Sequence, residues 1–117
     1  MKRMTPEGYI LDSIMDWLAA EHILAFRMPV GGAHVTGGYM RFGVKGMADI
    51  LAFPQIKIYS NTIGSAALIT PLPVWIEVKT AKGVQSEFQK SFQAQVEAEG
   101  HRYVLARSVD DVMASLK

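Results

Sequence analysis

The sequence predicts a single α/β domain in which a mixed β-sheet is flanked by helices. The chain has 117 residues, half of them hydrophobic, which is close to the usual size of one domain. The expected elements alternate in the order α-β-(β)-β-β-α-β-α. The pattern does not decide whether the bracketed element is a strand or only an extended segment. One helix lies between two strands, the βαβ arrangement that usually joins parallel neighbours. The chain has no cysteine, which excludes disulfide frameworks and thiolate zinc sites.

The first two expected elements are a helix and a strand. Thr5 is suited to cap the helix, Pro6 to occupy its first position, and an acid follows in the first turn. Apolar residues recur at helical spacing over 10–18, so the helix should end near residue 20. Residues 23–28 alternate in polarity and predict a strand.

The middle of the chain is harder to interpret. Residues 29–38 carry four glycines and a proline, which predicts a loop, and 39–42 could be a short strand or an extended approach. A strand is expected over 47–53, closed by Pro54. Segment 55–73 is expected to have some order of its own, including a possible strand over 56–59 and a turn over 60–62.

The C-terminal part carries clearer signals. The sequence predicts a strand over 74–79, a helix over 86–99, a strand over 102–107 and a short helix that begins at Ser108. Phe88 and Phe92 share one stripe of the longer helix and are expected to be buried. Gly100 is expected to end that helix.

Charge and hydropathy restrict the partners. The net charge is only +1, but residues 27–90 hold seven of the twelve basic residues and three of the eleven acids. That concentration indicates either a site for an anionic ligand or an ordinary scatter of surface charge. The most apolar stretch, 63–78, is interrupted by Pro71 and Pro73, and no secretory signal follows the basic N-terminus, so no membrane partner and a cytoplasmic location are expected.

Three charged residues stand out chemically. Glu77 and Lys79 lie two apart on a predicted strand and therefore share a face. Asp49 is the only acid in its own apolar strand, where desolvation demands a partner, a metal or solvent. If these strands pair, two carboxylates converge and repel unless a proton or a cation lies between them. Oxygen ligands favour Mg²⁺ or Mn²⁺, and the Val78 carbonyl could add another.

Such a set suits attack of water on a phosphodiester. Lys79 could orient the attacking water or stabilise charge that grows on the phosphate. The alternative is a structural Asp–Lys or Glu–Lys pair that holds the sheet together. Gln89, on the polar side of its helix, could touch the water or the phosphate. Glu7 is most simply an acid that interacts with the helix dipole, or a further carboxylate if its helix packs across the end of the sheet.

Taken in order, these segments resemble the VRR-NUC branch of the PD-(D/E)XK nucleases. The segments that carry the resemblance are Gly46-Met47-Ala48-Asp49, Ile76-Glu77-Val78-Lys79 and Gly83-Val84-Gln85-Ser86 with Gln89. The start of the first helix, Arg27 and residues 108–112 are also similar to that family. The resemblance implies a restriction-endonuclease-like mixed sheet of order α-β-β-β-α-β-α. It also implies that Asp49, Glu77 and the Val78 carbonyl hold the metal, with Lys79 and Gln89 catalytic and Glu7 an accessory ligand.

The resemblance further implies a Mg²⁺-dependent endonuclease, with Mn²⁺ able to substitute, that cuts branched DNA such as Holliday junctions as a homodimer. The expected DNA contacts are Arg27, Arg41, Lys45 and Lys82. Compared with the family that the chain resembles, segment 55–73 is an expected insertion, and its apolar part is the expected dimer surface. Three alternatives stay open: a catalytically silent DNA-binding or assembly module, a flap or nicking nuclease, and a hydrolase of small phosphate esters.

Overall fold

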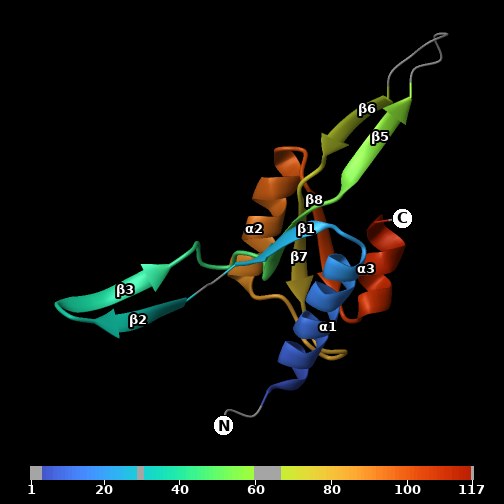
Figure 1. Ribbon diagram of the computed structural model, residues 1–117. Helices are drawn as coiled ribbons and strands as arrows, with labels where there is room; N and C mark the ends of the chain where they lie inside the picture. The colour runs from blue at the N-terminus through green and yellow to red at the C-terminus, as the bar shows by residue number, and fades with distance from the viewer. Residues whose placement is uncertain (1–3, 29–30, 60–66, 117) are drawn as a thin grey trace.

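The computed structural model describes residues 4–28, 31–59 and 67–116, and it confirms a mixed α/β fold. Its centre is an open four-stranded sheet with strands in the order β1-β4-β7-β8 (Figure 1). The described elements are α1 (Pro6–Ala20), β1 (Leu24–Arg27), β2 (Gly31–Val35), β3 (Gly38–Phe42), β4 (Ile50–Phe53), β5 (Gln55–Tyr59), β6 (Ala67–Pro71), β7 (Val74–Val78), α2 (Glu87–Ala98), β8 (Arg102–Ala106) and α3 (Val109–Leu116).

The first helix forms as its sequence predicts. The Thr5 hydroxyl accepts a hydrogen bond from the Gly8 N–H at 3.0 Å, which satisfies one of the free donors at the helix start. Leu11, Ile14 and Leu18 follow at helical spacing and are buried against the sheet. Burial of this apolar stripe fixes α1 across one face of the sheet.

Helices cover the sheet on both faces. Antiparallel pairing joins β1 to β4 and β4 to β7, whereas β7 and β8 run parallel because α2 crosses between them. Ile50, Ile76 and Val104 project onto the face that α1 and α3 cover. On the opposite face, α2 places Phe92 and Val96 against residues that include Trp75 and Tyr103. Strand β7 is therefore buried from both sides.

Two hairpins extend from this core in different directions (Figure 1). The expected loop over 29–38 is wrong in part, because Gly31–Val35 forms β2 and pairs with β3. Its two-residue turn includes Gly37, whose positive φ of 94° suits a tight hairpin turn. The expected strand over 56–59 is confirmed as β5, and its pairing with β6 was not predicted. The expected turn over 60–62 lies outside the described residues.

Two further predictions need correction. The strand expected over 47–53 begins only at Ile50, because Asp49 uses its side chain, not its backbone, to bond β7. Phe88 was expected to be buried beside Phe92, yet it is 51% exposed. The buried stripe of α2 starts one turn later, since Phe88 lies over the turn that contains Gly46 instead of over the sheet.

Among the described helices, none combines the length and hydropathy needed to span a membrane.

Replacing Gly46 with alanine is expected to destabilise the fold by about 2 to 4 kcal/mol. Gly46 has a φ of +84°, and a Cβ there would lie 2.3 Å from the carbonyl oxygen of Phe88, a backbone atom that cannot move alone. Urea unfolding measures the loss. Gly100→Ala is the matched control, because Gly100 has a φ of +86° but a Cβ would meet no described atom within 4 Å. Equal losses in the two variants would show that the contact with α2 is not tight.

Candidate metal centre

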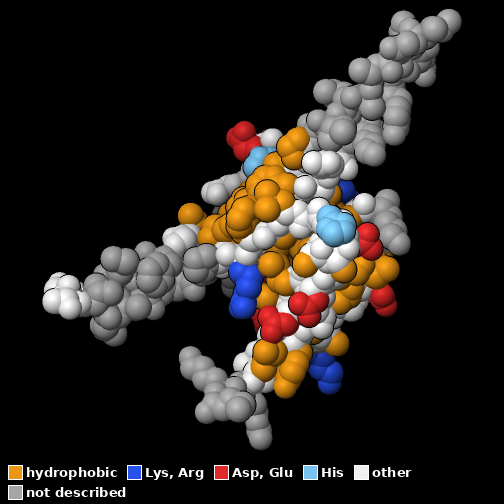
Figure 2. Space-filling view, in the orientation of Figure 1, with side chains coloured by type: hydrophobic (Ala, Val, Ile, Leu, Met, Phe, Trp, Pro, Cys, Tyr) orange, Lys and Arg blue, Asp and Glu red, His pale blue; other side chains and the backbone are white. Residues whose placement is uncertain are grey.

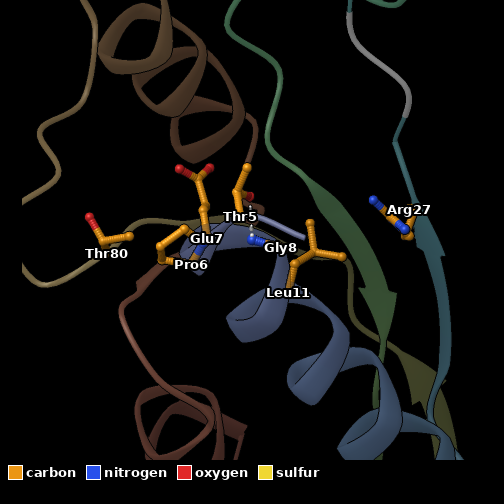
Figure 3. Close-up of a pocket in the computed structure, with 7 residues that line it drawn as sticks. All are labelled: Thr5, Pro6, Glu7, Gly8, Leu11, Arg27 and Thr80. Carbon is orange, nitrogen blue, oxygen red and sulfur yellow. Dashed lines mark hydrogen bonds between the residues drawn. The ribbon is translucent and has the colours of Figure 1, made fainter. Parts of the chain in front are cut away.

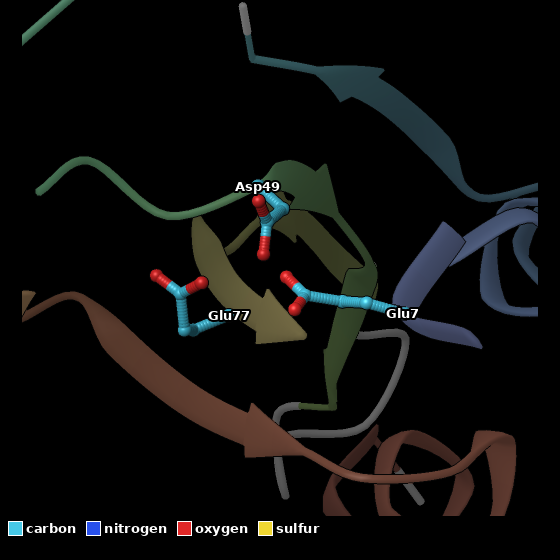
Figure 4. A group of neighbouring side chains, drawn as sticks. All are labelled: Glu7, Asp49 and Glu77. Atoms are coloured by element: carbon cyan, nitrogen blue, oxygen red, sulfur yellow. The ribbon is translucent and has the colours of Figure 1, made fainter. Parts of the chain in front are cut away.

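Three carboxylates meet at the end of the sheet where β7 terminates. One oxygen from each of Glu7, Asp49 and Glu77 lies within 4.8 Å of the other two. Figure 4 shows the three side chains turned toward one another from α1, the segment before β4, and β7. The sequence prediction that Asp49 and Glu77 converge is therefore confirmed, and Glu7 joins them.

Strand register explains why the two sheet acids meet. Ile50 pairs with Ile76 in the antiparallel β4–β7 ladder, so one step further places Asp49 opposite Glu77. The Val78 N–H points toward β4, which makes 49 and 77 a pair without backbone hydrogen bonds between them. In such pairs the Cα atoms are only about 4.5 Å apart and the side chains are closest. The sheet itself forces the two carboxylates together.

Asp49 is held from two sides. Its Oδ2 accepts a hydrogen bond from the Val78 N–H at 2.7 Å, and its backbone carbonyl accepts one from the Met28 N–H at 2.7 Å. The N–H and C=O of one strand residue leave the strand on the same side. The Val78 carbonyl therefore also faces the side of β7 on which Asp49 lies, as its expected role as a metal ligand requires.

Glu77 is the most unusual side chain of the cluster. It is 1% exposed, and it is the only charged or polar residue in the buried core of the described chain. Its Oε1 has no hydrogen-bond partner among the described residues. Burial, followed by the hydrogen bond with Asp49 and the negative charge of Asp49, raises the pKa of Glu77 to about 9, against a smaller opposing effect of Lys79. A proton or a cation must therefore accompany this carboxyl at neutral pH.

Glu7 connects the cluster to an open cleft of about 500 Å³. The cleft is lined by Thr5, Pro6, Glu7, Gly8, Leu11, Arg27 and Thr80. Figure 3 shows Glu7 and Thr80 on one side of it and Arg27 on the other. Glu7 is only half-buried, so a ligand that enters the cleft can reach the carboxylates.

Lys79 and Gln89 occupy different surroundings. Lys79 directly follows β7 and is half-buried, and it forms no ion pair within 4.0 Å in the described part of the chain. The Gln89 Oε1 accepts a hydrogen bond from the Ser86 N–H at 2.8 Å and completes a capping box at the start of α2. The carbonyl of Gln89 is thus engaged in capping the helix, and its catalytic role stays a prediction.

The basic residues expected to contact DNA are spread around this site. Arg27 is exposed at the cleft and lies 3.8 Å from Asp12, an exposed ion pair of little energetic weight. Lys45 and Lys82 are exposed on the turns before β4 and after β7. The side chain of Arg41 lies outside the described residues. Figure 2 shows a basic side chain at the place where β1 ends in Figure 1, next to acidic side chains that lie over α1.

The sequence did not reveal how Arg107 supports the loop after Lys79. The Arg107 Nη1 donates to the carbonyl oxygens of Thr80 at 2.6 Å, Ala81 at 3.2 Å and Gly83 at 2.8 Å. A Cβ at Gly83 would lie 3.3 Å from Lys79 Cβ and Cδ, so this loop packs against the Lys79 stem. The parallel pairing of Val78 with Ala106 was the available signal, since it brings residue 107 beside residue 79.

Replacing Arg107 with alanine is expected to loosen residues 80–83. For the nuclease activity that the sequence predicts, we expect a cleavage rate about tenfold lower, because Lys79 would be less well oriented. Hydrogen exchange of the amides in 80–83 and single-turnover cleavage measure the two effects. Arg107→Lys should restore part of both, since an ammonium can donate to the same carbonyls. Unchanged exchange in Arg107→Ala would show that the three hydrogen bonds do not hold the loop.

A polar network that was also not predicted lies on the α2 side of the sheet. The Gln85 Nε2 donates to the Tyr103 hydroxyl at 3.1 Å and to the Gln93 Oε1 at 3.0 Å. Burial, and secondarily the charge of Glu77, raises the pKa of Tyr103 to about 12, so its hydroxyl stays protonated. Gln85 and Gln93 are therefore part of a polar network and not simply surface residues.

Comparison with known proteins assigns no family to this chain. A scan against protein-family models finds no match, and searches of curated proteins and of solved structures likewise find no similar chain.

Proposed function

We propose that this protein is a Mg²⁺-dependent DNA endonuclease that hydrolyses phosphodiester bonds. The observation that carries the proposal is the meeting of Glu7, Asp49 and Glu77 within 4.8 Å, with one buried oxygen of Glu77 lacking a partner among the described residues. A buried carboxylate with one oxygen that has no partner is costly, so it indicates a function beyond folding. The donor set consists of oxygens alone, which suits Mg²⁺ and allows Mn²⁺ to substitute.

Each side chain has a role in this proposal. Asp49, Glu77 and the Val78 carbonyl hold the cation, and Glu7 is an accessory ligand from α1. A bound Mg²⁺ polarises a phosphate oxygen and lowers the pKa of a water molecule. Lys79 contributes a positive charge and hydrogen-bond donors beside the reacting phosphate. Glu77 must lose its proton before it can bind the cation, so metal binding would release a proton.

The proposed fold is restriction-endonuclease-like. Without the two hairpins, the chain runs α1-β1-β4-β7-α2-β8-α3, which is the order α-β-β-β-α-β-α. Support comes from the combination of an antiparallel β1-β4-β7 sheet with one parallel strand, β8, that follows the crossover helix α2. The proposed site lies at the end of β7, between α1 and the start of α2.

The proposed substrate is branched DNA such as a Holliday junction, cut by a homodimer. The chain forms one such cluster in its described part, and symmetric cutting of a four-way junction needs two. The β5–β6 hairpin projects from the sheet, where it can reach a second copy (Figure 1). The role of 55–73 as the dimer surface stays a prediction, because most of its side chains lie outside the described residues.

Rival functions predict different products. A silent DNA-binding or assembly module would not need an unpartnered buried carboxyl next to two others, which is why catalysis is favoured. A flap or nicking nuclease would use the same residues on another DNA shape. A hydrolase of small phosphate esters would use the same cluster without the surrounding basic residues.

The test is a panel of labelled four-way junction, flap, nicked, duplex and single-stranded DNA, with Mg²⁺ or with EDTA, beside a measurement of mass in solution. We expect symmetric cutting of the junction with Mg²⁺ only, by a particle of twice the chain mass. Binding without any cutting would favour the silent module. Cutting of flaps alone, or of a small diester but no DNA, would favour the other two rivals.

A further inference from the structure

The first turn of α2 presents an aromatic side chain to solvent. Phe88 is 51% exposed, although the rest of the apolar stripe on this helix is buried. Two more apolar side chains are also exposed, Val84 four residues before Phe88 and Val44 in the turn that contains Gly46. A half-exposed phenylalanine contributes little to the core, and its exposed ring offers a surface on which a ligand can bind.

Phe88 is positioned rigidly next to the turn that leads to Asp49. The backbone of Gly46 approaches the carbonyl of Phe88 so closely that a Cβ at Gly46 would lie 2.3 Å from it. Gly46 is three residues from Asp49, and three residues span at most about 10 Å. The backbone of Phe88 therefore contacts the same short turn that leads into Asp49.

A basic side chain lies against Phe88. The Lys45 Nζ lies over its ring, 4.0 Å from the centroid, a cation–π arrangement at an exposed site. Lys45 is exposed and is the cation that contacts the ring, whereas Lys90 in α2 is paired with Glu87 at 3.4 Å. An aromatic ring beside an ammonium group matches the two parts of a nucleotide, a base that stacks and a phosphate that carries negative charge. That charge complementarity favours a nucleic acid over an apolar protein partner.

We propose that Phe88 is a stacking platform for an unpaired base of the DNA substrate. The base stacks on the exposed part of the ring, and the Lys45 ammonium, which lies over one ring face, binds the neighbouring phosphate. This inference rests on the proposed function, and it narrows the substrate class to DNA with unstacked nucleotides at a branch point or in a single strand. Bases paired and stacked within a duplex cannot reach the ring, so the platform selects for DNA shape without reading sequence.

The test measures DNA affinity in EDTA, where no cleavage is possible, by fluorescence anisotropy of labelled single strand, four-way junction and duplex. Phe88→Ala should weaken binding of the first two about tenfold or more and of the duplex less than twofold. Phe88→Trp should keep the wild-type affinity, whereas Phe88→Leu should lose as much as Phe88→Ala, because leucine is apolar but cannot stack. Val84→Ala is the control for an exposed apolar side chain and should change nothing.

Other outcomes overturn the platform. Wild-type affinity in Phe88→Leu, equal weakening for all DNA forms, or no binding of single strands by the wild type would each do so. A fall in particle mass with unchanged DNA affinity would assign Phe88 to a protein interface instead.

Lys45→Gln should lower the salt slope of binding by about one for every DNA form. Cleavage assays distinguish failure of this proposal from failure of the proposed function. If the wild type cuts DNA but the Phe88 variants bind DNA normally, only the stacking platform is wrong. If the Phe88 variants bind DNA less well but the wild type cuts no DNA, only the nuclease proposal is wrong.

Discussion

Glu77→Ala is expected to lower the rate of DNA cleavage about a thousandfold or more while the protein still binds DNA. Glu77 supplies the most deeply buried oxygens of the cluster, and its loss leaves Asp49 and Glu7 without the ligand that faces them. Lys79→Ala should cause a loss of at least about a hundredfold, because it removes the charge beside the reacting phosphate but none of the carboxylates.

Single-turnover cleavage of labelled junction DNA at high Mg²⁺ measures both losses. Matched controls come from the exposed surface of α2: Glu97→Ala removes an acid and Lys90→Ala removes a lysine, and both should cut at the wild-type rate. Circular dichroism and anisotropy confirm that each variant folds and binds. A wild-type cleavage rate in Glu77→Ala would show that the three carboxylates are not the active site.

In the absence of divalent cations, the protein should lose stability as the pH rises from about 5 to 9. The pKa of Glu77 is 4.5 in an ordinary environment and about 9 in the fold, so the folded state keeps a proton that the unfolded chain has lost over this range. The contribution of this group is complete below pH 4.5 and disappears as the pH rises toward 9. One such proton corresponds to at most about 1.4 kcal/mol per pH unit.

Thermal or urea unfolding in EDTA at several pH values measures this slope. Glu77→Gln should flatten it and should be more stable than the wild type at pH 8, because an amide never loses a proton and can still bond Asp49. Mg²⁺ should stabilise the wild type at pH 8, by about 2.7 kcal/mol at one hundred times its Kd, and should have little effect on Glu77→Gln. A slope that survives this substitution would assign the pH dependence to another group.

Elements with strong local signals were predicted correctly from the sequence. Thr5 and Ser86 are side-chain caps that act within three residues, so the starts of α1 and α2 could be read directly. Strand β7 was recognisable because it is apolar on both faces apart from Glu77. In contrast, the glycines that fold back β2 onto β3 look the same in a loop and in a hairpin, so that hairpin was missed.

The candidate site depended on information that local patterns do not contain. The chemistry of Asp49, Glu77 and Lys79 was visible in the sequence, but their meeting required the register that puts residue 49 opposite residue 77. Glu7 could not be separated from an ordinary helix-dipole acid, because its role depends on where α1 crosses the sheet. Arg107 gave no signal of its own, since its partners are backbone carbonyls that any residue provides.

The hydrogen bond from the Val78 N–H to Asp49 has a consequence for how the protein keeps its site open. In an uninterrupted ladder, that N–H would donate to the carbonyl of Ala48 and the two strands would continue side by side. The Asp49 side chain replaces this bond, so the two strands separate directly beyond the pair of carboxylates. A hydrophobic residue at position 49 would remove one carboxylate of the proposed metal site and would also allow the ladder to continue, so the site would lose a proposed ligand and its open end together.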